Sequence, residues 1–94
     1  MKVRIQYTAQ LRSAVGRVEE DVELAGDASL GDLLVRLATE LHREAAPFVL
    51  AAGGELQPSL LIGVNGQGVS PREAQNVTLQ DGDVITLMPP IAGG

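Results

Sequence analysis

The residues with the clearest chemical potential stand at the end of the chain, which reads Pro89-Pro90-Ile91-Ala92-Gly93-Gly94. Gly93 and Gly94 carry no Cβ, so the pair can enter a channel too narrow for any other residue. It delivers one defined group there, the α-carboxylate of Gly94. Pro89 and Pro90 each fix φ near about −65°, so we expect them to hold the arm stiffly away from the body. The sequence therefore predicts an arm that presents a carboxylate to the active site of another protein.

A carboxylate needs activation by a partner before it can react. Conversion to a mixed anhydride, for instance by adenylation, would let sulfur add to the carbonyl carbon of Gly94 and leave a thiocarboxylate. The chain has no cysteine, and the thioethers of Met1 and Met88 cannot carry sulfur in transferable form. The carboxyl carbon of Gly94 is therefore the one place where this chain could carry covalent sulfur.

The other candidate residues do not assemble a reactive set, so we predict no catalytic residue and no metal site. His42 is the single histidine, with no cysteine to activate, and is interpreted as structural or exposed. The acidic run Glu19-Glu20-Asp21 with Glu23 is interpreted as a solvated strand face, with docking of a basic partner as the alternative. The glycine-rich segment 63–68 lacks the Lys-Ser/Thr of a phosphate loop, which favours a hairpin.

Length and composition narrow the class of protein. A chain of 94 residues forms one domain, and we expect it to span residues 1–90, followed by a flexible tail over 91–94. The net charge of −5 and the presence of only two aromatic residues argue against nucleic-acid binding, which needs clustered cations and stacking surfaces. Alternation begins directly after Met1 and no apolar run reaches the length of a membrane span, so a cytoplasmic location is expected.

The periodicity of the sequence predicts which elements position the tail. Period-two alternation predicts strands over 2–7 and 18–24, joined by a connection with room for a helical turn. Ser29 and Asp32 form a short capping box, and leucines at helical spacing then predict one helix over 30–45, ended by Pro47. Its leucine stripe is expected to pack on the sheet.

The second half of the chain predicts three further strands. Residues 60–64 form a nearly continuous apolar run typical of an interior strand, and Asn65-Gly66 is a strong hairpin turn. Residues 77–79 are predicted as a short edge strand and 84–88 as the last strand, which ends at Pro89 because proline cannot donate a ladder bond.

This order predicts an α+β protein with a ubiquitin-like β-grasp fold. One main helix crosses one face of a mixed sheet of four or five strands, and a right-handed crossover places the first and last strands side by side. The predicted core consists of twelve apolar residues from the helix and the strands: Val3, Ile5, Val22, Leu24, Leu33, Leu34, Leu37, Leu41, Ile62, Val64, Ile85 and Leu87.

Several motifs give the chain a resemblance to the ubiquitin-like sulfur carriers, which include the small subunit of molybdopterin synthase and the thiamine-pathway sulfur carrier. The motifs are Ala9-Gln10-Leu11-Arg12 with Gly16, the helix from Ser29 to Leu41, Val64-Asn65-Gly66, Leu79-Gln80-Asp81-Gly82-Asp83-Val84, and the Pro-Pro to Gly-Gly tail. The Asp-Gly-Asp turn combined with the terminal glycines is the specific part. The paired prolines and the long loop over 47–58 look more like the molybdopterin synthase subunit, or carriers of cysteine biosynthesis, than the compact thiamine carrier.

The resemblance implies adenylation of Gly94 by a ubiquitin-activating-like enzyme that uses ATP, followed by sulfuration, with no cofactor bound permanently to the carrier. It also implies a larger catalytic subunit as the sulfur acceptor. We expect both partners to use an exposed apolar patch of Leu61, Val84 and Met88 on the sheet face away from the helix. The alternatives are sulfur delivery to cysteine, thiamine or tRNA, a protein modifier joined to lysines, and a plain interaction domain.

Overall fold

The alternation at the start of the chain forms an antiparallel pair of strands in the computed structural model, which describes residues 1–89. Strand β1 (Lys2–Tyr7) buries every second side chain and pairs with strand β2 (Glu19–Glu23). Between them lies a two-turn helix, α1 (Ala9–Val15), which Gly16 ends in the left-handed conformation at φ 84°. The predicted hairpin is thus confirmed, and its connection is a helix longer than the single turn that the sequence indicated.

The main helix begins where the capping residues predict. Helix α2 (Leu30–Arg36) follows Ser29, whose Oγ accepts a hydrogen bond of 3.0 Å from the backbone N–H of Asp32. The Asp32 carboxylate accepts in return from the backbone N–H of Ser29 at 3.3 Å. Two of the otherwise unpaired N–H groups at the helix start are therefore satisfied by a reciprocal pair of side chains.

The end of this helix differs from the predicted range of 30–45. After α2 the chain widens into a π-helical turn, η1 (Leu37–Leu41), in which the His42 N–H donates to the Leu37 carbonyl at 2.8 Å. His42 then leaves the helix with φ −143° and ψ 88°. The reason is a tertiary contact, because the His42 ring is hydrogen-bonded to Glu20 on strand β2.

The sequence predicts that Pro47 ends the main helix, and this prediction is wrong because the helix already ends at His42. After His42 the chain forms a short 3₁₀ turn, η2 (Arg43–Ala45), and a one-turn helix, α3 (Ala46–Val49). Pro47 sits in the first turn of α3. A proline is tolerated there because the N–H that it lacks would have no partner within the helix.

The second hairpin forms as the Asn-Gly pair predicts. Strand β3 (Leu61–Val64) turns at Asn65 and Gly66, which have φ 52° and 85°, and returns as strand β4 (Gln67–Val69). Positive φ at both turn residues matches the right-handed twist of the flanking strands. Strand β5 (Val84–Met88) is the predicted last strand.

Residues 77–79 were predicted as an edge strand, and this prediction is wrong. After the 3₁₀ segment η3 (Pro71–Asn76), they run against the start of α2, with one isolated bridge between Ser29 and Thr78. The Leu30 N–H donates to the Val77 carbonyl at 2.8 Å, and the Leu79 N–H donates to the Ala28 carbonyl at 3.0 Å. The edge beside β3 is already occupied by β4, so this segment pairs with the residues at the start of α2 instead.

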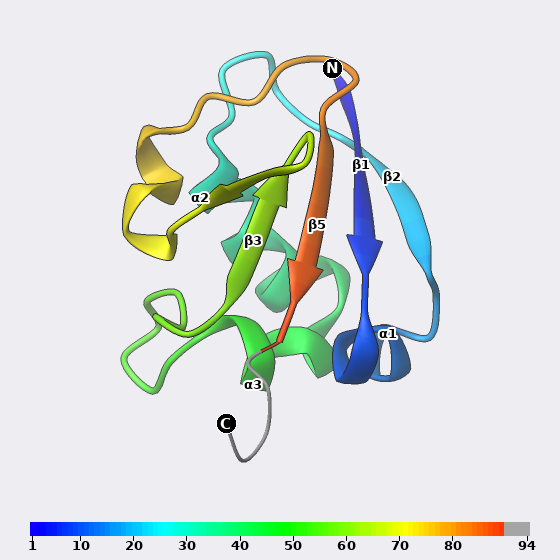
Figure 1. Ribbon diagram of the computed structural model, residues 1–94, viewed down its shortest axis with the longest axis vertical. Helices are drawn as coiled ribbons and strands as arrows, with labels where there is room; N and C mark the ends of the chain where they lie inside the picture. The colour runs from blue at the N-terminus through cyan, green and yellow to red at the C-terminus, as the bar shows by residue number, and fades with distance from the viewer. Residues whose placement is uncertain (90–94) are drawn as a thin grey trace.

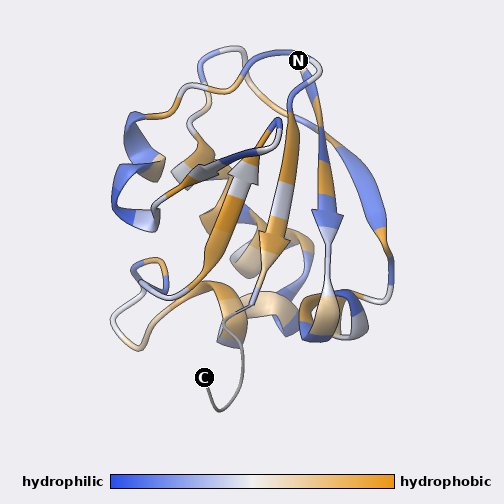
Figure 2. Ribbon diagram, viewed as in Figure 1, coloured by the Kyte–Doolittle hydropathy of each residue, from blue (hydrophilic) through white to orange (hydrophobic). Residues whose placement is uncertain are grey.

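The five strands form one mixed sheet in the order β2-β1-β5-β3-β4, with the first and last strands parallel (Figure 1). Helix α2 covers one face, and the other face is open toward the viewer (Figure 1). Nine of the twelve predicted core residues are buried, and Leu24, Leu41 and Val64 pack partly buried against them. Figure 2 shows the apolar residues concentrated in β3 and β5, and polar ones in β2. The α+β class and the ubiquitin-like sheet are therefore confirmed.

Candidate functional site

The start of strand β5 is fastened by the Asp-Gly-Asp turn. The Asp83 carboxylate accepts from the Gln80 N–H at 2.8 Å and from the Asn65 side-chain amide at 2.9 Å. The Asn65 side-chain oxygen accepts in turn from the Val84 N–H at 2.9 Å. Because β5 also lies between β1 and β3, its position is set from both sides. The strand that leads to the tail is therefore in the middle of the sheet.

The end of β5 is held at the body. The Thr8 hydroxyl donates to the Leu87 carbonyl at 3.1 Å, and Met88 is the last residue of the strand. Pro89 itself is buried. The prediction that Pro89 and Pro90 hold the arm away from the body concerns residues beyond Pro89 and stays a prediction. The start of the tail is thus anchored. The predicted tail residues Pro90, Gly93 and Gly94 lie outside the described residues.

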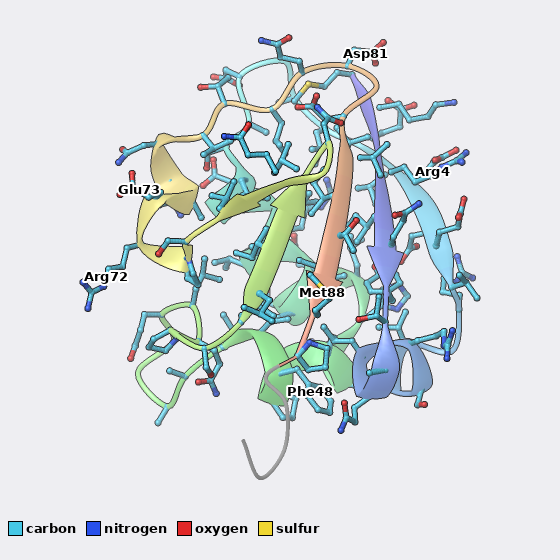
Figure 3. All side chains as sticks on the ribbon, in the orientation of Figure 1. Arg4, Phe48, Arg72, Glu73, Asp81 and Met88 are labelled. Carbon is cyan, nitrogen blue, oxygen red and sulfur yellow. The ribbon has the colours of Figure 1, made fainter. Side chains whose placement is uncertain are left out.

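The open face carries two of the predicted patch residues as direct neighbours. Leu61 and Met88 pair across β3 and β5 and are 48% and 38% exposed. Figure 3 places Met88 near the end of β5, where the chain leaves the sheet. An exposed apolar pair of this kind marks a contact surface, and it lies beside the origin of the tail.

Val84, the third predicted residue, is separate from this pair. It lies four residues before Met88 on β5, about 13 Å along the strand, next to Arg4 on β1. Thr86 stands between them on the same face, and its hydroxyl donates to the Gln6 side-chain oxygen at 3.1 Å. The predicted single patch is therefore divided by a polar pair.

The Leu61–Met88 pair borders a shallow groove of about 420 Å³ that runs toward the edge strand β4. Gly63 and Gly68 are paired across β3 and β4, so no side chain rises from the sheet at these two positions. The lining residues include none that is charged: Pro58, Leu60, Leu61, Ile62, Gly68, Val69, Ser70, Pro71 and Met88. The groove suits an uncharged surface of another protein.

The acidic run lies mostly on the open face and is compensated there by β1. Arg4 contacts the carboxylates of Glu19 and Asp21 at 2.9 and 3.0 Å, and Lys2 pairs directly opposite Glu23 in the ladder. The hydrogen bond from Arg4 lowers the pKa of Asp21. Because Arg4 binds two of these carboxylates and Lys2 stands opposite the third in the ladder, the geometry favours the solvated face over a docking surface for a basic partner.

Glu20 is the exception, and sequence reasoning missed its role. It turns to the helix side, where its carboxylate accepts from the Tyr7 hydroxyl at 2.6 Å and contacts the His42 ring. Arg17 contacts its other oxygen at 3.3 Å, and the rings of Tyr7 and His42 meet edge to face. A signal was present, since Glu20 interrupts the apolar side of its strand. This cluster fastens the end of η1 to the sheet, so His42 is a structural histidine.

Ionisation of the Tyr7 hydroxyl provides a measurement of this cluster. Burial and the Glu20 carboxylate raise the pKa of the Tyr7 hydroxyl above its ordinary value. The folded state therefore retains a proton that the unfolded state releases above pH ~10, so stability should fall as pH rises beyond that point. Tyr7 is the single tyrosine and there is no tryptophan, so phenolate absorbance reports this residue alone. We expect phenolate to appear together with the loss of far-UV circular dichroism. A phenolate signal that precedes unfolding would contradict the buried contact.

The described residues contain no group of three or more His, Asp or Glu side chains that could hold a metal ion. Within the same part of the chain, none of the helices has both the length and the apolar character needed to cross a membrane.

Comparison with known proteins places this arrangement in a family. The ThiS family matches residues 5–94. Small archaeal modifier protein 3 of Haloferax volcanii is 30% identical over the full length of both chains, and the molybdopterin synthase sulfur carrier subunit of Chlamydomonas reinhardtii is 28% identical, also over both full lengths. The crystal structure of SAMP1 from Haloferax volcanii matches with a TM-score of 0.87 at 28% identity and covers both chains completely. The chain therefore belongs to the ThiS family of ubiquitin-like sulfur carriers, which are carrier proteins and not enzymes.

Proposed function

We propose that this protein carries sulfur as a thiocarboxylate on Gly94. The observation that carries the proposal is that the family match extends to residue 94 in a chain without cysteine. The carboxyl carbon of Gly94 is then the group on which transferable sulfur can be held. We assign the activation chemistry to partner enzymes, because members of this family are carrier proteins.

Two steps convert the carboxylate of Gly94 to a thiocarboxylate. The Gly94 carboxylate attacks the α-phosphorus of ATP on a ubiquitin-activating-like enzyme, forms an acyl adenylate and releases pyrophosphate. Hydrosulfide (HS⁻) released by a sulfur donor then attacks the carbonyl carbon. The C–S bond forms as the C–O bond to AMP breaks, AMP leaves with the electron pair, and the S–H proton passes to water to give the thiocarboxylate. ATP is consumed on the activating enzyme, and the carrier binds no permanent cofactor. The direct test is whether Gly94 gains sulfur when ATP, the activating enzyme and a sulfur donor are all supplied.

The fold supports separate roles for the domain, which binds the partner, and the tail, which carries the reactive carboxylate. The central strand β5 ends beside the exposed Leu61–Met88 pair, and the anchored Pro89 sets the point from which the tail starts. A partner that binds this pair therefore receives the tail at a defined position. We propose that the activating enzyme and a larger catalytic subunit use the same surface in turn.

Molybdopterin synthesis is the pathway that we favour, with this chain as the small subunit. The support is the Chlamydomonas relative, whose name is that of the carrier subunit of molybdopterin synthase. Sulfur delivery to cysteine, thiamine or tRNA uses the same carboxylate and differs only in the acceptor enzyme. Binding to each candidate acceptor enzyme of the host would separate these routes.

A second function, protein modification, is favoured by the Haloferax volcanii relatives that are named small archaeal modifier proteins 1 and 3. The same acyl adenylate serves both functions, because an amine and a sulfur nucleophile attack the same carbonyl carbon. A modifier produces a ladder of conjugates on blots of cell lysate, and a pure carrier does not.

Met88→Asp tests the docking surface. A carboxylate at this position would have to be desolvated against an apolar partner surface, so binding to the activating enzyme and to the larger subunit should weaken at least tenfold, about 1.4 kcal/mol or more. The side chain is 38% exposed, so the fold should survive. Val18→Asp is the matched control, since Val18 is 58% exposed and precedes the edge strand β2, which is separated from β5 by β1. Titration calorimetry that finds equal binding for both variants would place the interface elsewhere.

A further inference from the structure

The chain has a single lysine, Lys2, and its other six basic residues are arginines. This matters for the second function, because an activated carboxylate forms a stable amide with a primary amine and arginine does not supply one. The chain could therefore receive a copy of itself at very few positions.

The structure makes Lys2 the available amine. Its side chain is exposed on the open face of β1, and within residues 1–89 its ammonium group takes part in no ion pair or hydrogen bond. The α-amino group of Met1 is engaged, because it donates to the Leu24 carbonyl at 2.8 Å while the Leu24 N–H donates to the Met1 carbonyl at 2.8 Å. Met1 is thus held in a continuation of the ladder between β1 and β2.

Lys2 also lies far from the surface that we assign to docking. The Gly82 N–H donates to the Lys2 carbonyl at 2.8 Å, so Lys2 is level with the turn before β5. Met88 is six residues beyond Gly82, which is about 20 Å along the strand. Figure 3 shows this separation, with Asp81 near the start of β1 and Met88 at the opposite end of the sheet. A partner bound at Leu61 and Met88 would leave Lys2 uncovered.

We propose that Lys2 is the acceptor site for a second copy of this chain, joined through its Gly94. This inference rests on the proposed activation of Gly94. The neutral Nζ of Lys2 attacks the carbonyl carbon of the acyl adenylate of the other copy, and a C–N bond forms as the C–O bond to AMP breaks. AMP leaves with the electron pair, and the amine proton passes to water. Every linkage between copies is then of one type.

The test uses the purified chain with ATP, Mg²⁺ and the activating enzyme of its host, without any other acceptor protein. We expect a species of twice the chain mass. Endoproteinase Lys-C, which cleaves after unmodified lysine, provides the readout because each copy has one site. In the conjugate the acceptor copy is blocked at Lys2, so intact mass should show the loss of one Met1-Lys2 dipeptide and not of two.

Lys2→Arg is the matched variant, since it keeps a cation opposite Glu23. It should lose the two-copy species while its melting temperature and its ATP–pyrophosphate exchange stay those of the parent. A two-copy species formed by Lys2→Arg, or parent conjugates that lose both dipeptides, would overturn the proposal. Normal pyrophosphate exchange without any two-copy parent species would also overturn it and leave the activation of Gly94 intact. Absence of pyrophosphate exchange would contradict both the activation of Gly94 and the acceptor role of Lys2.

Discussion

Deletion of Gly94 should abolish sulfuration completely and leave the melting temperature unchanged. The reactive carboxylate would then belong to Gly93, one residue too short to reach the point in the activating enzyme where the adenylate forms. The fold should not respond, because the described core extends from Val3 to Leu87 and ends before the tail. The measurement is intact mass after incubation with ATP, the activating enzyme and a sulfur donor. The parent should gain the mass difference between sulfur and oxygen on its C-terminal peptide.

Substitution of Gly93 provides a graded companion to this deletion. A Cβ restricts φ and would clash with a narrow channel, so sulfuration should fall from Gly93→Ala to Gly93→Phe. Both variants keep the length of the chain, which separates channel width from reach. If the Gly94 deletion is still sulfurated, the carrier proposal fails and a plain interaction domain takes its place. The same holds if the full chain forms no adenylate with any activating enzyme of its host.

Leu37→Ala should cost about 2–5 kcal/mol of unfolding free energy, the range for buried leucines that leave a cavity. Leu37 is fully buried at the junction of α2 and the π-helical turn η1, where the helix packs on the sheet. Urea denaturation measures the loss directly. Val35→Ala on the same helix is the control, because Val35 is 36% exposed and its truncation should cost much less. A Leu37→Ala protein that unfolds at the same urea concentration as the parent would contradict the packing of this helix.

The elements that the sequence predicted well are those encoded by local patterns. The alternation over Lys2–Tyr7, the Ser29–Asp32 capping box and the Asn65-Gly66 turn each set backbone conformation within a few residues, and each appears where predicted. The leucine spacing identified the buried face of α2 for the same reason, since helical periodicity decides which side chains share a face. The turn and tail motifs also predicted membership of a sulfur carrier family, and the match over residues 5–94 confirms this prediction.

Other features depended on contacts between residues far apart in the chain. Local pattern favoured a helix to residue 45, yet His42 leaves it because its ring meets Glu20, 22 residues away on β2. Residues 77–79 have the composition of a strand, but β4 already occupies the sheet edge and they pair with the start of α2.

The candidate site also combines features that local pattern predicts with features that depend on contacts between distant residues. The sequence was sufficient to predict that Leu61, Val84 and Met88 share the open face, because strand alternation assigns each side chain to one side of the sheet. It also shows that Lys2 is the single lysine. The neighbours on that face became known from the fold: Leu61 meets Met88, Thr86 and Gln6 separate Val84 from them, and Pro89 is buried. The physical reason is that alternation specifies a face, whereas strand order and register, which arise from packing of the whole chain, specify the neighbours on it.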